Sequence, residues 1–244
     1  MLDFYFLKKK NVGLIYNQDD LLELTKKSIK NNVMYLNTQT IVKRFKNSNI
    51  AKDLSKAIAT GTQPLIIIGY VGFEIPSTFE YDFLEHFKDD NGLGIVGGKL
   101  VDRNFRIIDA GVESPIASMP IWRNFGYDDG DIITDGPNKG KKNSNAGLAY
   151  ENSSIFIDGN FIIIRRDLFN EVGGINPDTH NYWAMELCLR MSQNSIRILY
   201  VPKDITHWNY FEHDVENMKK DYELGKDLLI EMFVKLNNKD KNKV

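Results

Sequence analysis

Two glutamates stand where a carboxylate could do chemistry. Glu74 follows an apolar run at residues 65–68 that suits a buried parallel strand, and ligands of such sheets bind at the strands' carboxyl ends. Glu186 lies in a segment of helical periodicity, where it is either a catalytic group or a surface or helix-pairing residue. A carboxylate placed beside a hydroxyl group can accept its proton as a general base.

Basic and aromatic residues add a second kind of chemistry. Arginine and lysine side chains can neutralise a phosphate without a metal ion, although loop lysines are more often simply solvated. The aromatic faces of Trp183 and Trp208 suit sugar rings, but both residues could equally pack in the core. The basic candidates are Arg103, Arg123, Lys139, Lys141, Lys142 and Arg190.

The composition is that of a globular protein in a reducing compartment. The chain has 244 residues, 42% of them hydrophobic and 26% charged, which disfavours wholesale disorder. A net charge of -2 gives no reason to expect nucleic-acid binding. Because Cys188 is the single cysteine, an intrachain disulfide is impossible. We find no signal peptide and no run of about 20 apolar residues, so we expect a cytoplasmic protein without a transmembrane segment.

The first hundred residues alternate between strand and helix patterns. This alternation predicts a Rossmann-like, mostly parallel sheet. The predicted strands are residues 11–16, 32–36, 65–68 and 94–96, and the predicted helices are 18–29, 41–59 and 79–87.

The second half has a different pattern. Residues 105–112 predict a hairpin arm, and the loop at 115–152 is either a functional lid or partly disordered. Residues 211–236 predict a helix that packs on the domain or forms an oligomer contact. The tail at 237–244 is rich in lysine and asparagine and should fray.

Residues 158–207 carry the most specific pattern. A strand leads to a short helix, the Gly173-Gly174 turn, a second helix ending in Leu187-Cys188-Leu189-Arg190, and a strand ending at His207. This order resembles the acceptor half of a family 2 glycosyltransferase. Upstream, Ile15-Tyr16-Asn17 and residues 94–100 resemble other parts of the same family. The resemblance therefore covers most of the chain.

The resemblance implies a fold of the GT-A type. Such a fold is a single α/β domain with a mostly parallel central sheet flanked by helices. Its nucleotide-sugar-binding half would span residues 1–98 and its acceptor half residues 99–210. A C-terminal helix at 211–236 would close the domain, followed by the flexible tail at 237–244.

The chain departs from the family where the chemistry is done. The Asp-x-Asp motif that holds a divalent cation, Mn²⁺ or Mg²⁺, falls on Tyr70 and Gly72, and the catalytic base falls on Ala184. Only His207 matches a metal ligand of the family, and a lone histidine cannot hold such a cation. Glu74 and Glu186 are the nearest carboxylates that could compensate.

The resemblance also assigns binding residues. The nucleoside-binding acid falls on Leu36 or Asn37, depending on the register. The residues expected on the donor side are Tyr16, Asn37, Tyr70, Gly72 and Lys99. Those expected on the acceptor side are Trp183, Ala184, Arg190 and Trp208.

Two functions follow from these matches and departures. The first is a glycosyltransferase-like protein that moves a sugar from a nucleotide-sugar donor to a glycan or glycoprotein acceptor, in surface glycan or glycoprotein biosynthesis. Two alternatives stay open for its cofactor: a divalent cation, which the missing Asp-x-Asp motif disfavours, or no metal ion. The alternative is a catalytically inactive pseudo-glycosyltransferase that binds a sugar, a nucleotide or a partner glycosyltransferase. A homo-oligomer fits either function. A nucleotidyltransferase is disfavoured, because Tyr16-Asn17-Gln18-Asp19 stands where its glycine-rich phosphate loop would be.

Overall fold

The structure is a computed structural model. It describes residues 2–8, 18–33, 38–44, 49–103, 105, 107–113, 121–122, 156–157, 159–208 and 231. Several predictions fall on residues outside these ranges. They are the strand at 11–16, Tyr16, Asn37, most of the loop at 115–152 and, apart from Glu231, the helix at 211–236.

A mixed sheet forms the centre of the described part. Its strands lie in the order β2 (Thr38–Arg44), β1 (Leu2–Lys8), β3 (Leu65–Tyr70), β9 (Phe161–Arg165), β5 (Leu93–Val101), β10 (Arg197–His207) and β4 (Phe73–Glu74). A further strand, β6 (Ile107–Asp109), pairs with β5, and β7 (Val112–Glu113) pairs separately with β8 (Ile121–Trp122).

Most neighbouring long strands of the sheet run parallel. Strand β1 pairs in parallel with β2 and β3, and β5 pairs in parallel with β10. Strand β9 is antiparallel to both β3 and β5, so β3, β5 and β10 all point the same way. The predicted α/β class with a mostly parallel central sheet is therefore confirmed.

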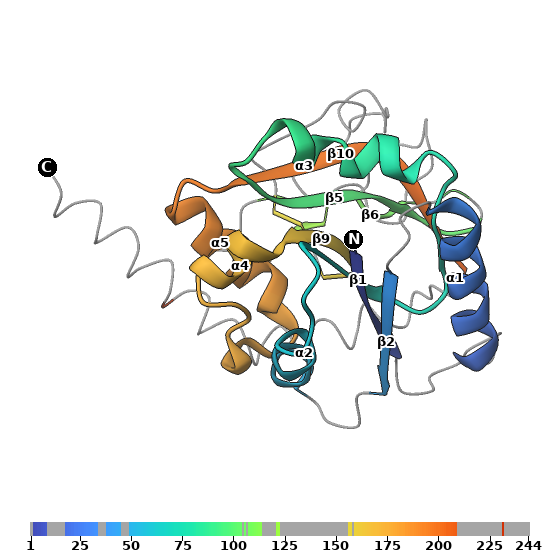
Figure 1. The fold of residues 1–244 in the computed structure, drawn as a ribbon, viewed down its shortest axis with the longest axis horizontal. Helices are drawn as coiled ribbons and strands as arrows, with labels where there is room; N and C mark the ends of the chain where they lie inside the picture. Colours follow the sequence, from blue (N-terminus) through green and yellow to red (C-terminus); the bar gives the residue numbers. More distant parts are fainter. Residues whose placement is uncertain are drawn as a thin grey trace, which may run out of the picture.

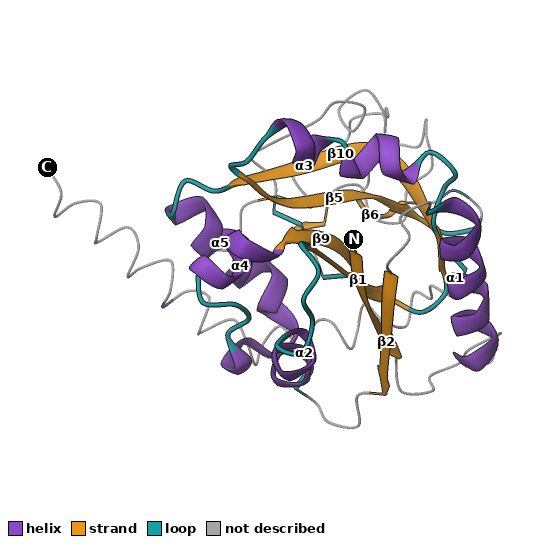
Figure 2. Ribbon diagram, viewed as in Figure 1, coloured by secondary structure: helices purple, strands orange, loops and turns teal. Residues whose placement is uncertain are grey.

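Helices flank the central sheet (Figures 1 and 2). The buried side chains between helices and sheet form two separate cores. One core joins strand residues such as Ile66 to α2 (Ile50–Ile58), α4 (Arg166–Glu171) and α5 (Trp183–Gln193). The other joins Ile67 to α1 (Gln18–Asn32) and to Glu80–Leu84 and α3 (His86–Asp89). Because successive strand residues point to opposite faces, the two cores lie on the two faces of the sheet.

The segment from β9 to β10 follows its sequence prediction. Helix α4 ends at two glycines with positive φ, 88° at Gly173 and 72° at Gly174, a conformation that other residues rarely adopt. The amide of Gly174 donates to the carbonyl of Phe169 at 2.9 Å, which closes the helix end. A 3-10 helix, Pro177–Tyr182, then leads into α5, where eight residues are buried.

Two elements of the first half differ from the prediction. The expected strand at 32–36 is contradicted at residues 32 and 33, because α1 continues through Asn32, and residues 34–36 lie outside the described part; the strand that pairs with β1 is Thr38–Arg44. The expected helix at 41–59 was wrong over residues 41–44, which belong to β2; the helix itself is Ile50–Ile58. Strand β1 at Leu2–Lys8 was not predicted at all.

Other predicted elements are confirmed. The helix expected at 18–29 is α1, and the strands expected at 65–68 and 94–96 lie within β3 and β5. The helical pattern at 79–87 corresponds to a π-helical turn, Glu80–Leu84, followed by α3. Within the described residues, none of the helices combines the length and apolar character needed to cross a membrane.

Candidate functional site

The carboxyl ends of β3, β5 and β10 meet at one edge of the sheet, because these strands share a direction. We call this the carboxyl edge. Ligands of open α/β sheets bind at such edges. Strand β3 ends at Tyr70 and is followed by Gly72 and Glu74; β10 ends at His207, next to Trp208. The structure therefore brings five of the predicted site residues to the same edge.

Both backbone polar groups of Gly72 form hydrogen bonds. Its amide donates to Thr25 Oγ1 at 2.9 Å, and its carbonyl accepts from the amide of Trp208 at 2.7 Å. Its φ of 106° is one that residues with a side chain rarely adopt. A Cβ atom here would lie 3.2 Å from Cδ2 of Leu21. An aspartate at this position would therefore be strained by its backbone conformation and would require Leu21 to shift.

The ring of His207 lies close to Gly72. Its Cε1 atom would be 3.7 Å from a Cβ atom on Gly72, and its side chain is 6% exposed. It also pairs across strands with Phe73, because β4 runs antiparallel to the end of β10. The structure therefore places His207 beside the second position of the Asp-x-Asp motif, where the resemblance expects a metal ligand.

Glu74 is engaged by Trp208. Oε2 of this exposed glutamate accepts a hydrogen bond from the indole Nε1 of Trp208 at 2.9 Å. The guanidinium carbon of Arg103 lies 5.8 Å from the centre of the Trp208 ring, within cation–π range. Arg103 follows β5 by two residues, so this group also joins the ends of neighbouring strands.

The other donor-side residues within the described part have their own partners. Nζ of Lys99 lies 2.9 Å from Oδ1 of Asp204 on β10, and the lysine is 13% exposed. Tyr70 is half-buried and packs against the core that contains α2 and α5.

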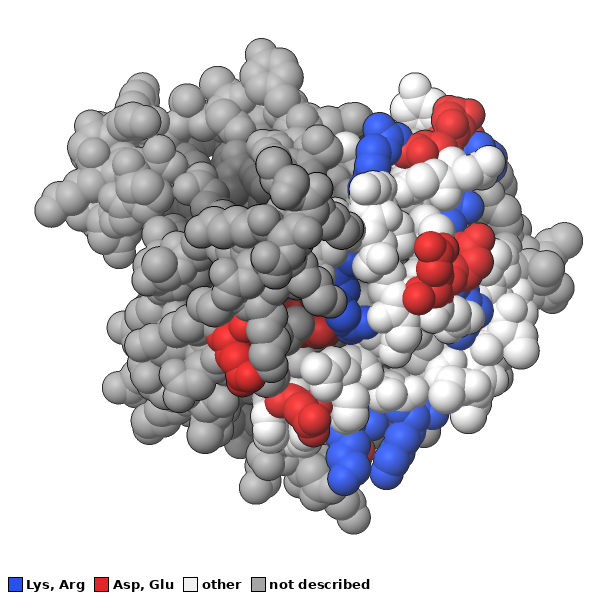
Figure 3. Space-filling view, turned by 90° about the vertical axis from the view of Figure 1, so that its left-hand side faces the viewer, with Lys and Arg blue, Asp and Glu red and all other residues white. Residues whose placement is uncertain are grey.

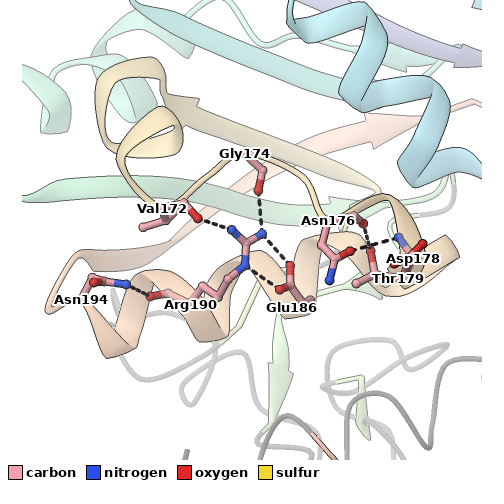
Figure 4. Close-up of polar contacts among 8 residues, drawn as sticks. All are labelled: Val172, Gly174, Asn176, Asp178, Thr179, Glu186, Arg190 and Asn194. Atoms are coloured by element: carbon pink, nitrogen blue, oxygen red, sulfur yellow. Dashed lines mark hydrogen bonds and ion pairs between the residues drawn. The ribbon is translucent and has the colours of Figure 1, made fainter.

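Glu186 is buried and closed by Arg190 (Figure 4). Arg190 Nε lies 2.5 Å from Oε1 of Glu186, and Nη2 lies 2.6 Å from Oε2. The same guanidinium donates to the carbonyls of Val172 and Gly174. The glutamate is 1% exposed. This geometry favours the helix-pairing interpretation of Glu186 over the catalytic one, and it makes Arg190 the residue that ties the turn after α4 to α5.

Trp183 and Ala184 are core residues. They are 2% and 1% exposed and pack in the core that contains α2. The indole of Trp183 covers Gly159, where a Cβ atom would come within 2.7 Å of the ring. The core-packing alternative therefore describes Trp183. Neither side chain is exposed for a sugar in this structure, and Ala184 offers no carboxylate at the position of the family's base.

The described residues do not fit a divalent cation. Among them, no three histidine, cysteine, aspartate or glutamate side chains are grouped so that they could hold a metal ion. At the carboxyl edge, Tyr70 and Gly72 carry no carboxylate, and one oxygen of Glu74 is bound by an indole. His207 alone remains of the family's ligand set, and hard cations such as Mn²⁺ and Mg²⁺ need several oxygen ligands.

The sequence reasoning missed Thr25. This buried threonine on α1 also donates to the carbonyl of Leu21 at 3.0 Å, so it links the helix to the turn after β3. A threonine inside an amphipathic helix carries no signal of such a role, because its partner lies 47 residues away.

Comparison with known proteins gives structural matches only. No protein-family model matches the chain, and neither does any curated protein. The structure of GalNAc-T7 with UDP, GalNAc and Mn²⁺ matches with a TM-score of 0.58 and 12% identity, over 86% of this chain and 43% of that one.

Two other solved structures are similar at lower scores. One is a mannosyltransferase from Pyrobaculum calidifontis in complex with GDP-Man and Mn²⁺, with a TM-score of 0.49 and 12% identity over 84% of this chain and 56% of that one. The other is S. aureus TarS 1–349, with a TM-score of 0.49 and 11% identity over 85% and 60%. The chain thus spans less than two thirds of each.

These identities show the fold alone. The match to GalNAc-T7 confirms the predicted GT-A type fold: a central sheet of mostly parallel strands flanked by helices. Membership of family 2 stays a prediction, which rests on the sequence motifs.

Proposed function

We propose that this chain is a glycosyltransferase-like protein that binds a nucleotide-sugar donor at the carboxyl edge and transfers the sugar without a divalent cation. The acceptor would be a glycan or a glycoprotein. The GT-A type fold supports the donor class, because the solved relative GalNAc-T7 was crystallised with UDP and Mn²⁺. The sequence motifs shared with family 2 support the reaction type.

The position of the His207 ring close to Gly72 carries this proposal. It matches the relative positions that the resemblance gives to the Asp-x-Asp motif and its distal histidine, yet Gly72 is locked in a conformation that excludes a relaxed aspartate. When a sugar leaves its nucleotide, negative charge builds up on the diphosphate and must be stabilised. We propose that basic side chains do this here.

Glu74 is the carboxylate that we propose as general base. It is exposed at the carboxyl edge, and only one of its oxygens is bound by Trp208 in the described part of the chain. A base of this kind removes the proton of the acceptor hydroxyl as the new bond forms. The exposure of the Glu74 residue is what allows an acceptor hydroxyl to approach this carboxylate.

A binding module without catalysis is the second candidate. It is favoured by the position of the family's base, where Ala184 is buried in the core and the nearby Glu186 is closed by Arg190. Such a protein would bind a sugar, a nucleotide or a partner glycosyltransferase at the same edge.

We extend the proposal to the organisation and setting of the protein. Residues 1–98 would bind the donor and residues 99–210 the acceptor, within one domain closed by a helix at 211–236. We propose a cytoplasmic protein of surface glycan or glycoprotein synthesis that acts as a homo-oligomer or with a partner glycosyltransferase.

Nucleotide binding and turnover test the proposal. Uridine, guanosine or deoxythymidine diphosphate at millimolar concentration should raise the melting temperature equally with EDTA and with Mn²⁺. Release of the nucleoside diphosphate from its sugar should then survive EDTA. If no nucleotide shifts the melting temperature under either condition, donor binding is wrong. If nucleotides bind but no sugar is transferred to any of a panel of acceptors, the binding module is the better description.

A further inference from the structure

Helix α1 carries polar side chains on its buried face. Thr25 and Ser28 are both buried, and their spacing of three residues places them on one side of the helix. Leu21 and Ile29 of the same helix pack in the core on this side of the sheet. Burying a hydroxyl group costs free energy unless it forms hydrogen bonds, so these two side chains need partners.

Both hydroxyl groups bind the main chain of one distant segment. Thr25 Oγ1 accepts from the amide of Gly72 at 2.9 Å. Ser28 Oγ accepts from the amide of Ile75 at 2.7 Å and donates to the carbonyl of the same residue at 3.1 Å. Glu74 lies between these two anchored residues, so α1 fixes the main chain on either side of it.

Strand β10 and Asn32 complete the attachment of this segment. Strand β4 pairs antiparallel with the end of β10, and the carbonyl of Gly72 accepts from the amide of Trp208 at 2.7 Å. Asn32 Nδ2 donates to the carbonyl of Ile75 at 2.6 Å. Glu74 itself is exposed, so an accessible carboxylate stands on a main chain that is held from two directions.

Such an attachment suits a general base. A base must lie within hydrogen-bond reach of the proton it removes, and a misplacement of about 1 Å can lower a rate about 100-fold. Strand β4 has only two residues, so its own ladder holds it weakly. The hydrogen bonds from α1, whose apolar side chains pack in the core, add the rigidity that this short strand lacks.

The exposed side of α1 has a different kind of polar contact. There Lys26 and Glu23 form an ion pair at 2.8 Å within the helix. The described part of the surface in Figure 3 likewise carries acidic and basic side chains near one another. Exposed pairs of this kind add little to stability. Thr25 and Ser28 instead bind a segment 47 residues away, so the buried hydroxyl groups connect α1 to the main chain around Glu74.

We infer that Thr25 and Ser28 are positioning residues for Glu74, because they fix the main chain that carries this carboxylate to the acceptor hydroxyl. This inference rests on the proposed function, in which Glu74 is the general base. In the transfer, the bond from the sugar to the diphosphate breaks and the acceptor oxygen bonds to the sugar. The proton of the acceptor hydroxyl passes to Glu74, and the two hydroxyl groups of α1 only hold its position.

Initial rates of the full chain test the inference. The donors are hexoses linked to uridine, guanosine and deoxythymidine diphosphate, and the acceptors are free hexoses, in EDTA or Mn²⁺, whichever supports turnover by the wild type. Ser28→Ala removes both bonds to Ile75 and should lower kcat by about 10- to 100-fold. The KM for the donor should stay within about twofold of wild type.

Two variants of Thr25 test the other hydroxyl group. Thr25→Val keeps the shape of the side chain but loses the bond to Gly72, so it should also lower kcat. Thr25→Ser keeps the hydroxyl group and should retain most of the wild-type rate. All rates are measured well below the unfolding midpoint of each variant, so that only folded protein is compared.

A double-mutant cycle separates positioning from a purely structural role. In the Glu74→Gln background the base is already lost, so adding Ser28→Ala should lower the rate by no more than about twofold further. A purely structural hydroxyl would lower the rate by the same factor in both backgrounds.

A matched control removes a buried hydroxyl group elsewhere. Thr179 is buried in the 3-10 helix that packs against α2, and its hydroxyl donates to the carbonyl of Asn176 at 2.7 Å. Thr179→Val should therefore lower the unfolding midpoint and leave kcat within about twofold of wild type.

The outcomes separate this inference from the proposed function. If the wild type transfers no sugar, or if Glu74→Gln is as fast as the wild type, the proposed transfer or its base is wrong, and the inference falls with it. If Glu74→Gln is slow but folded Ser28→Ala and Thr25→Val are as fast as the wild type, the base stands and the role of α1 is wrong. Equal losses from Ser28→Ala in both backgrounds would also overturn the inference.

Discussion

Glu186 and Glu74 were both candidate catalytic carboxylates in the sequence, but they occupy opposite environments in the structure. Glu186 on α5 is 1% exposed, and both of its oxygens are bound by Arg190. Glu74 on β4 is exposed, and one of its oxygens accepts from the indole of Trp208. The carboxylate of Glu186 therefore stabilises the fold around α5, whereas the carboxylate of Glu74 stays at the surface of the carboxyl edge.

This difference teaches how burial decides the role of a carboxylate. A buried charge is tolerated only when a partner compensates for its lost hydration. A partner that forms hydrogen bonds to both carboxylate oxygens leaves neither oxygen available to accept a proton from a substrate. An exposed carboxylate needs no such compensation, so it stays able to exchange a proton. Substitutions in the two regions should therefore act on different observables.

The largest effect on stability is expected at Glu186. Glu186→Ala removes the partner of a guanidinium that is only 20% exposed, and breaking such a pair costs about 3–5 kcal/mol in free energy of unfolding. Urea unfolding would measure this. The double variant Glu186→Leu, Arg190→Met should recover only part of the loss, because no unpaired charge remains but the carbonyls of Val172 and Gly174 lose their donor. A single variant as stable as the wild type would show that the pair is not structural.

A smaller loss is expected at Gly72. Gly72→Ala forces a side chain into φ near 106° and against Leu21, which should cost about 1–3 kcal/mol. Gly72→Asp restores the acid of the Asp-x-Asp motif but should be destabilised at least as much, and Mn²⁺ should not raise its melting temperature. If Mn²⁺ does stabilise Gly72→Asp over Gly72→Ala, the edge can hold a cation after all.

Glu74→Gln should leave stability almost unchanged and act on turnover instead. The side chain is exposed, so we expect a change of less than about 0.5 kcal/mol in free energy of unfolding. Loss of a general base should lower the transfer rate by about 10²- to 10⁴-fold. Initial rates in an acceptor assay would measure this, with Glu171→Gln, another exposed glutamate, as the control. Unchanged rates would show that Glu74 is not the base.

The smallest effect on stability is expected near a second carboxylate–arginine pair. This pair lies at the amino end of β1, opposite the carboxyl edge. Arg166 Nη2 lies 2.7 Å from Asp3 Oδ2, and the buried Tyr5 lies near this pair. Burial raises the pKa of the Tyr5 hydroxyl above its usual value of 10.0, and Arg166 opposes this rise only in part. The fold therefore favours the neutral phenol.

The stability that follows from this preference is fully present below pH 10 and should be lost as the pH rises through the higher pKa of the folded state. Chemical unfolding at about pH 9 and about pH 11.5, on either side of the ordinary tyrosine pKa of about 10, would measure the decline in the free energy of unfolding. Tyr5→Phe has no group to ionise, so the difference between the two proteins should grow in this range. Parallel curves would contradict the assigned pKa direction.

The second half of the chain was predictable because its signals are local. The glycines at 173 and 174 mark the end of α4 through their own conformational freedom, and α5 shows its buried face in its periodicity. The pair of Glu186 and Arg190 also has the spacing of neighbours on a helix, so its structural role could be weighed from the sequence.

The first half was harder because its strands depend on distant partners. Strand β1 contains Asp3 within an apolar run, and the arginine that allows this burial lies 163 residues later. Strand β2 pairs only with β1 in the described sheet, and a strand at such a position needs fewer apolar residues, which weakens its pattern. The wrong predictions at residues 32–33 and 41–44 have this cause.

By itself, the sequence determined the α/β class, the segment from β9 to β10 and the absence of carboxylates at Tyr70, Gly72 and Ala184. These depend on residue types and on periodicity over one or two turns. Only the tertiary structure decided that the pair of Glu186 and Arg190 is buried, that His207 lies close to Gly72, and that Trp208 joins Glu74 to Arg103. Contacts such as the last two join residues more than a hundred positions apart, and only the packed sheet brings such strand ends together.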